Sequence, residues 1–170
     1  TTLQVLPGSA NLVGGRGVTL RNVPATSYQA MKFPGAPWGL KMACGENTKR
    51  VYGGKGTTQS TRMGNVAGYR AAFIAARDYK DKWDKWRETG QGTPPTRNLQ
   101  LDTLAGVLDG SILTQNHCYR ADEMAVMLDV AKEFGYKVTT FHHAVEAYKI
   151  APMLAREGVY AQVRMRSGEV

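Results

Sequence analysis

The sequence predicts an α/β protein whose strands run parallel, in a sheet that is either covered on both sides or closed as a barrel. In the second half of the chain, short apolar segments alternate with segments of helical periodicity. Helices of roughly 10 to 15 residues between such strands indicate βαβ units with right-handed crossovers. The short strands also lack an alternation of polar and apolar residues, which is typical of strands buried on both faces.

The first half of the chain is less regular and predicts two strands, at 3–6 and 39–43. A glycine-rich stretch, 7–17 (PGSANLVGGRG), separates them. From about residue 64 to residue 89, apolar side chains recur at helical spacing, which predicts a long amphipathic helix. Its second half mixes lysine and aspartate, so we expect that part to extend into solvent.

Residues 45–97 form an unusually long link between the strand at 39–43 and the next helix–strand unit, and the link ends in a loop at 90–97 (GQGTPPTR). In an α/β barrel such an insertion lies on the rim of the active site. The 170 residues are the size of one domain and suffice to bury a core.

The second half of the chain predicts three helices, each closed by a glycine, and three strands. The helices are 98–109, 121–134 and 146–157, followed by Gly110, Gly135 and Gly158. The strands are 111–116, 136–141 and 159–163. Pro152 lies inside the last helix and either kinks it or marks its true start.

The composition is that of a soluble globular protein with a net charge of +8. The basic residues are scattered, apart from a cluster between 49 and 62, and acidic neighbours balance those of the long helix, so we expect no specific nucleic-acid binding. No apolar run approaches the roughly 20 residues of a membrane helix, and no membrane association is expected. The start does not read as a signal peptide, so the compartment is open between cytoplasm and periplasm or secretion.

The chain begins directly with Thr1–Leu6, a segment that has the pattern of a strand from its first residue, so further sequence is expected upstream. Cys44 and Cys118 are too few to indicate a disulfide framework and leave the redox compartment open.

All three histidines fall at or just past the ends of predicted strands. His117 follows the strand 111–116, and His142 and His143 follow the strand 136–141. Ligands and catalytic groups gather at the carboxyl ends of parallel strands, and neutral imidazole is a common ligand for zinc. The alternative is that these are capped or partly buried histidines with no ligand, and the joint placement of His117 and His143 leaves both interpretations open.

Lys41 lies inside the apolar strand of GLKMACG (39–45). A buried ammonium is costly, so such a lysine is paired, neutral or chemically modified, unless its head reaches solvent. A neutral amine can react with carbon dioxide to form a carbamate, which is an anionic oxygen ligand suited to bridging two metals.

Two other patterns carry less weight. The stretch 53–58 (GGKGTT) fails as a phosphate-binding loop, because Lys49 and Gly56 stand where the first glycine and the Ser or Thr are required. Cys118 could act as a nucleophile, but it and His117 are neighbours on a strand and point to opposite faces.

The runs 112–124 (ILTQNHCYRADEM) and 137–150 (KVTTFHHAVEAYKI) resemble the fifth and sixth barrel strands of the amidohydrolase superfamily, more narrowly its imidazolonepropionase-like branch of dipeptidases and carboxypeptidases. Residues 1–20 and 39–54 (GLKMACGENTKRVYGG) are similar to earlier segments of bacterial members. The resemblance covers the chain to about Val159 and is lost over 163–170.

This resemblance implies a partial TIM-type (β/α) barrel with one or two divalent metal ions, by preference zinc, and hydrolysis of amide or related C–N bonds of a small or peptide-like substrate. It matches Lys41 to a lysine that becomes carboxylated, and His117 and His143 to histidine ligands. His142, Tyr119 and Arg120 are then candidates for substrate binding, the last two for a substrate carboxylate.

The family's His-X-His pair and its catalytic aspartate have no counterpart here, so we expect an incomplete barrel, 1–170, with 45–97 inserted on its rim and with the catalytic residues outside it. Such a truncated chain need not be active alone. The alternative is a non-enzymatic α/β module that self-associates through open sheet edges, and either way we expect a homo-oligomer.

Overall fold

The structure is a computed structural model that describes residues 1–163, and the sequence beyond it, where the family resemblance is lost, lies outside the described residues. Its centre is a curled six-stranded sheet in the order β1-β2-β3-β4-β5-β6. The strands are β1 Thr2–Val5, β2 Val13–Arg21, β3 Trp38–Ala43, β4 Ile112–His117, β5 Val138–His142 and β6 Tyr160–Gln162. This mixed α/β arrangement fits a partial barrel.

The strands β3, β4, β5 and β6 are parallel neighbours, as the alternation of strands and helices predicts. The prediction of parallel strands throughout is wrong for the first two, because β1 pairs antiparallel with β2, and β2 antiparallel with β3. The connection between β1 and β2 is too short for the crossover of a dozen or more residues that a parallel pair needs.

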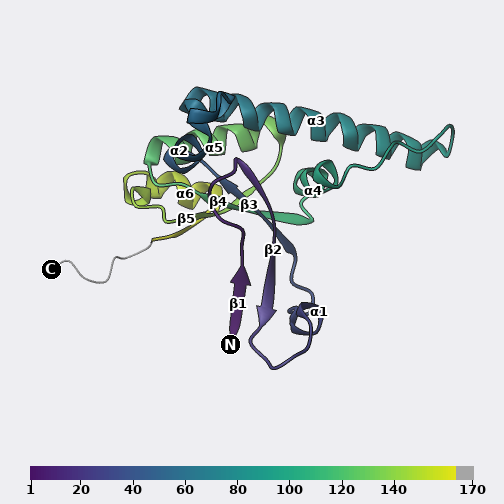
Figure 1. Ribbon diagram of the computed structural model, residues 1–170, viewed down its shortest axis with the longest axis horizontal. Helices are drawn as coiled ribbons and strands as arrows, with labels where there is room; N and C mark the ends of the chain where they lie inside the picture. The colour runs from purple at the N-terminus through teal and green to yellow at the C-terminus, as the bar shows by residue number, and fades with distance from the viewer. Residues whose placement is uncertain (164–170) are drawn as a thin grey trace.

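The glycine-rich stretch is only partly a linker, since its last five residues belong to β2. A Cβ at Gly17 would lie 2.4 Å from Leu6 Cδ2 and 2.9 Å from the Val5 carbonyl oxygen. The glycine therefore lets the end of β1 pack directly onto β2. In Figure 1, β1, β2 and the short helix α1 (Tyr28–Met31) form an arm that points away from the larger helices.

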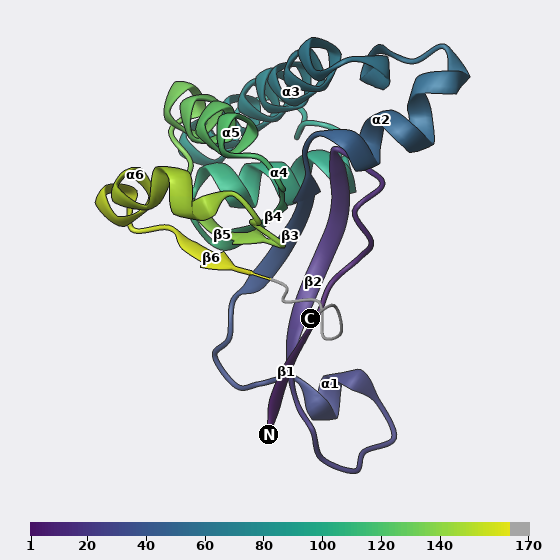
Figure 2. The same ribbon diagram turned by 90° about the vertical axis from the view of Figure 1, so that its left-hand side faces the viewer.

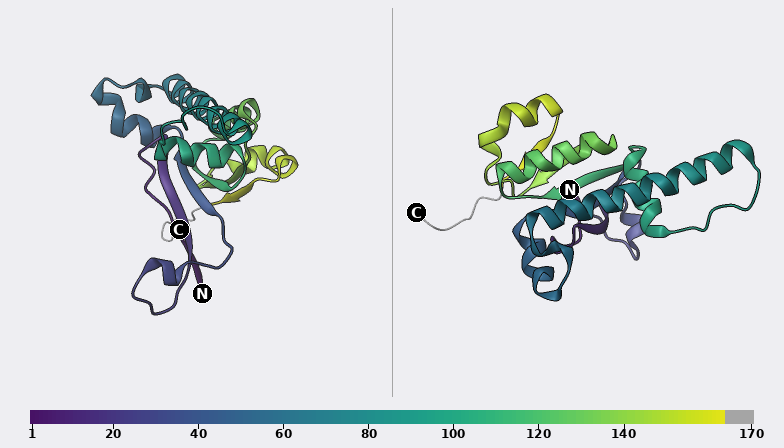
Figure 3. Two further views of the ribbon diagram at one scale, coloured as in Figure 1. Left: turned by 90° about the vertical axis from the view of Figure 1, so that its right-hand side faces the viewer. Right: turned by 90° about the horizontal axis from the view of Figure 1, so that it is seen from above.

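The larger helices gather on one side of the sheet (Figures 1 and 2). They are α2 Glu46–Tyr52, α3 Arg62–Thr89, α4 Leu99–Leu108, α5 Ala121–Phe134 and α6 Ala151–Glu157. The link between β3 and β4 contains α2, two short 3₁₀ turns, α3 and α4, and Figure 3 shows α3 running across the sheet and beyond its edge. No helix within residues 1–163 is both long and apolar enough to cross a membrane.

Helix ends follow their local sequence. Thr61 begins α3 by accepting a hydrogen bond from the Gly64 backbone N–H through its side chain, and Gly135 ends α5 in the left-handed conformation. The predicted helix 146–157 is two elements, a 3₁₀ helix at Ala147–Ile150 and then α6. Pro152 lies in the first turn of α6, so it marks the true start of that helix.

The main core lies between the sheet and helices α3 and α5. Leu40 and Met42 of β3 are fully buried and share this core with Phe73 of α3 and Met124 of α5. The Phe73 ring stacks on Tyr136 with 4.4 Å between centroids. Because side chains alternate along a strand, burying Leu40 and Met42 toward the helices turns Lys41 to the opposite, concave face.

Candidate functional site

Polar side chains gather on the concave face, toward the carboxyl ends of three adjacent parallel strands. Ala43, His117 and His142 are register partners across β3, β4 and β5. Two residues earlier on their strands, Lys41 of β3 pairs with Gln115 of β4. Residues two apart on a strand share a face, so Lys41, Gln115, His117 and His142 all project from the same side.

His117 is the most deeply buried member of the group, with an exposed fraction of 1%. Both of its ring nitrogens, Nδ1 and Nε2, are buried and have no hydrogen-bond partner. Its ring centroid lies 4.7 Å from that of His143 and 4.6 Å from that of Tyr119, which meets it edge-on. A buried polar atom without a partner is costly, so these nitrogens mark a place where a ligand would be stabilising.

Burial lowers the pKa of His117 from 6.5 to about 4, with smaller contributions from positive charge at His143, Lys41 and His142. The pKa of His142 is also lowered, by burial first and then by Lys41. Both rings are therefore neutral near pH 7, and neutral imidazole is the form that binds metal ions.

Lys41 is 6% exposed, and burial lowers the pKa of its ammonium. The prediction of a lysine inside an apolar strand is thus confirmed, and its head group does not reach bulk solvent freely. The strand register places Lys41 on the same face of the sheet as His117 and His142, and its positive charge lowers the pKa of both histidines.

His143 follows β5 directly and has a φ of 65°, the one positive φ at a non-glycine residue within 1–163. A left-handed conformation at such a residue costs about 1 to 3 kcal/mol and is concentrated at functional sites. The turn brings the His143 ring next to that of His117 even though His142, not His143, is the register partner of His117.

His142 is held by two glutamines that the sequence analysis did not single out. Its Nε2 lies 2.7 Å from Gln115 Oε1, and its Nδ1 lies 2.7 Å from Gln162 Oε1. A neutral ring donates from one nitrogen and accepts at the other, so one of the glutamines turns its amide NH₂ group to the ring. Gln115 lies two residues before His117 on the same strand and therefore shares its face, and this spacing is the signal that could have identified the first of them.

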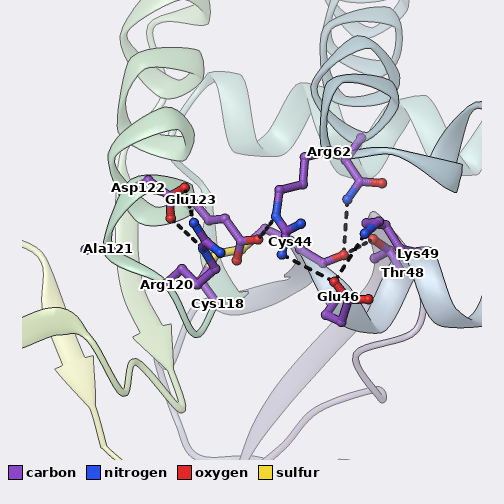
Figure 4. A network of polar contacts seen from close by, with 12 residues as sticks. Cys44, Glu46, Thr48, Lys49, Arg62, Cys118, Arg120, Ala121, Asp122 and Glu123 are labelled. Carbon is purple, nitrogen blue, oxygen red and sulfur yellow. Dashed lines mark hydrogen bonds and ion pairs between the residues drawn. A yellow bond between two sulfur atoms is a disulfide. The ribbon is translucent and has the colours of Figure 1, made fainter.

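Tyr119 and Arg120 differ in their relation to this group. The ring of Tyr119 is partly exposed and lies beside both His117 and His143. Arg120 is exposed and donates two hydrogen bonds of 2.9 Å to the carboxylate of Asp122 (Figure 4). Tyr119 therefore lines the site, whereas the guanidinium of Arg120 is already paired with a carboxylate.

The two cysteines form a disulfide, so neither is a free thiol and the alternative of Cys118 as a nucleophile does not hold for this state. Their Cα atoms are 5.3 Å apart, in the usual range for a disulfide. They directly follow β3 and β4, so the parallel register brings them together across a sequence separation of 74. Figure 4 shows the bond beside Glu123 and Arg62.

Within residues 1–163, no group of three or more His, Cys, Asp or Glu side chains is placed to hold a metal ion. The predicted set of Lys41, His117 and His143 contains only two side chains of these types. Any metal site here would thus depend on Lys41 or on groups outside the described residues.

The chain matches no family model. It is 33% identical over 172 aligned residues to amidohydrolase tasK of Hapsidospora irregularis, which covers 92% of this chain and 18% of that protein. The crystal structure of an amidohydrolase from Thermotoga maritima MSB8 is similar with a TM-score of 0.88 and 34% identity, covering 96% of this chain and 42% of that one. The chain thus spans less than half the length of either relative, and both similarities support a relationship to the amidohydrolases.

Proposed function

We propose that this chain carries part of the active site of a metal-dependent amidohydrolase, an enzyme that hydrolyses amide or related C–N bonds. Two relatives similar over nearly the whole chain are named amidohydrolases. The observation that carries the proposal is His117, a buried imidazole with two unpartnered nitrogens beside His143 and near Lys41.

The side chains of Lys41, His117 and His143 are of types that bind a divalent metal. We propose that they bind one or two zinc ions. An unpartnered buried nitrogen costs about 1 to 3 kcal/mol, and coordination through one ring nitrogen of His117 would offset this cost for that nitrogen. The lowered pKa values of His117 and Lys41 favour the neutral forms. A neutral Lys41 amine is the form that reacts with carbon dioxide, and the resulting carbamate would supply the oxygen ligand that the two histidines lack. We propose Lys41, His117 and His143 as the ligands.

When bound, such a metal supplies a Lewis acid that polarises the substrate carbonyl. The chain's own residues shape the space around it. Tyr119 forms a wall beside the two proposed histidine ligands. His142 is fixed by Gln115 and Gln162, so it offers a rigid polar edge for substrate binding. The depth of His117 keeps water from its ring.

We further propose the imidazolonepropionase-like branch and a dipeptidase or carboxypeptidase type of activity on a small or peptide-like substrate. Arg120 would bind a substrate carboxylate by exchanging it for Asp122, which it already holds in a geometry suited to a carboxylate. Residues 1–170 would form one domain, with 45–97 on the rim of the site.

Hydrolysis assays with zinc-supplemented protein test this function. A panel of dipeptides and N-acyl amino acids should be cleaved by a longer protein that contains this chain together with the missing strands, and not by its His117→Ala variant. Lys149→Ala is the control for Lys41→Ala, because Lys149 is an exposed lysine that pairs with Glu146 and is not one of the proposed ligands. Absence of C–N hydrolysis from that longer protein when it is zinc-loaded, or equal rates for its Lys41→Ala and Lys149→Ala variants, would contradict the proposal.

A second proposal concerns self-association, including the non-enzymatic alternative. In the described part of the chain the sheet ends at β1 and β6, whose residues are exposed throughout. Leu3, Val5 and Tyr160 on these edges are exposed apolar side chains. Exposed edge strands favour pairing between chains. Sedimentation at micromolar concentration should show a dimer, and a monomer would refute this proposal.

A further inference from the structure

We propose that the Cys44–Cys118 disulfide is a redox-sensitive clamp on the strand ends of the site, opened by a small thiol that reaches Cys44 through an adjoining cavity. Cys44 lies three residues after Lys41, and Cys118 directly follows His117. The bond therefore ties together the two strands from which two of the proposed ligands project.

The strands remain paired without the disulfide. The Cys44 backbone N–H donates to the His117 carbonyl over 2.8 Å, and the Cys118 backbone N–H donates to the His142 carbonyl over 3.2 Å. Opening the disulfide would thus release a side-chain link while these backbone hydrogen bonds still join the strand ends.

A cavity of about 230 Å³ gives access to one sulfur of the pair. Cys44 lies in its wall with Gly45, Arg62 and Glu123, and the 84%-exposed Met63 lies among its lining residues. Cys118 does not line it and is 0% exposed. A small thiol entering this cavity would meet Cys44 and not Cys118.

The surroundings of Cys44 stabilise its reduced form. Glu123 Oε1 accepts a hydrogen bond from Arg62 Nε over 2.6 Å, and its other oxygen, Oε2, lies 3.8 Å from Cys44 Sγ. A disulfide sulfur carries no proton, so this oxygen gains nothing from the oxidised state. A reduced Cys44 can donate its S–H to it. Figure 4 shows Glu123 between Arg62 and the disulfide.

Gly45 leaves the space in which the Glu123 carboxylate lies close to Cys44. A Cβ at Gly45 would lie 2.3 to 2.6 Å from the carboxylate atoms of Glu123, and the glycine has a φ of 72°. Both the space and the backbone conformation thus require glycine next to the sulfur.

The exchange balances with two equivalents of a small thiol. The first, as thiolate, attacks Cys44 Sγ, forms a mixed disulfide there and breaks the bond to Cys118, whose sulfur takes up a proton. The second attacks the mixed disulfide, leaving Cys44 as a thiol and the small thiol oxidised to its disulfide. The protein disulfide gains two electrons and two protons, and the two small thiols lose them.

The experiment equilibrates folded protein with reduced and oxidised glutathione at several ratios, then blocks free thiols and locates them by mass spectrometry. We expect reversible exchange in the folded state, with the glutathione adduct on Cys44. Glu123→Met should shift the equilibrium toward the disulfide by about threefold to tenfold, the value of one hydrogen bond. Asp122→Asn is the matched control, since Asp122 lines the same cavity but pairs with Arg120.

Two free thiols in protein never exposed to reductant, an adduct on Cys118, or no exchange before unfolding would overturn the clamp. These results need only the unsubstituted chain, so they hold even if Glu123→Met fails to fold. The effect on metal binding rests on the proposed function and is read separately, by titrating zinc into both redox forms. If zinc binds neither form while exchange at Cys44 proceeds, the metal proposal fails and the clamp stands.

Discussion

Protonation of His117 should destabilise the metal-free chain as the pH falls. Its pKa is lowered from 6.5 to about 4 in the folded protein, chiefly by burial. Between these values the unfolded chain binds a proton at this residue and the folded chain does not, so stability is present above pH 6.5 and is lost toward pH 4. Below pH 4 both states are protonated and the loss is complete.

The size of the effect follows from the shift. One pKa unit corresponds to about 1.4 kcal/mol, and for pKa values of 6.5 and about 4 the loss between pH 7.5 and pH 4.5 is about 2.5 kcal/mol. His117 is 1% exposed, so solvent screening reduces this figure little. Carboxylates that titrate in the same range add their own change, and a variant without the imidazole separates the two.

Urea unfolding with a chelator present, at pH 7.5 and pH 4.5, measures the difference. The free energy of unfolding of the unchanged chain should fall by about 2.5 kcal/mol more than that of His117→Gln, which keeps a polar side chain that does not titrate. Equal losses in the two proteins, or a His117 pKa near 6.5 by NMR in the folded state, would refute the reasoning.

Three further predictions concern stability and are measured by urea or thermal unfolding. Gly45→Ala should cost about 3 kcal/mol, since the new Cβ meets the Glu123 carboxylate at a φ of 72°; a neutral result would show that this strand end is not tightly packed. Phe73→Ala should cost about 3 to 5 kcal/mol, because the ring is fully buried in the core, and a loss below 1 kcal/mol would contradict the packing. Replacing Cys44 and Cys118 together with alanine should cost about 4 kcal/mol, from the chain entropy of a loop closed over a sequence separation of 74, and unchanged stability would argue against the disulfide.

The sequence predicted the second half of the fold well because its local signals agree. Helix α5 spans the predicted residues 121–134, since its apolar periodicity and its closing Gly135 point to the same boundary. The strands β4 and β5 were predicted within two residues for the same reason.

The first half was less accessible because long-range pairing decides it. β2 lies partly in a glycine-rich stretch that reads as a linker, and it forms a strand because Gly17 lets β1 pack closely against it. Helix α2, at Glu46–Tyr52, was not predicted, since it begins after Gly45 without a capping side chain.

In the site, too, local sequence signals were enough to predict some features, whereas others depend on long-range pairing. Placing His117 and His143 at strand ends was enough to predict that they meet, and their rings do lie together. The glutamines that hold His142 and the pairing of Cys44 with Cys118 depend on the register between strands, which the sequence does not specify. That Lys41, His117 and His143 bind a metal remains a prediction.

The most direct test of that prediction is a zinc titration of the chelator-stripped chain, with the bound metal counted by elemental analysis. We predict at least one tightly bound zinc per chain, with affinity lowered at least about tenfold in His117→Ala and in His143→Ala, and unchanged in Lys149→Ala. No stoichiometric zinc in the unchanged chain, or equal affinity in all four proteins, would contradict the account.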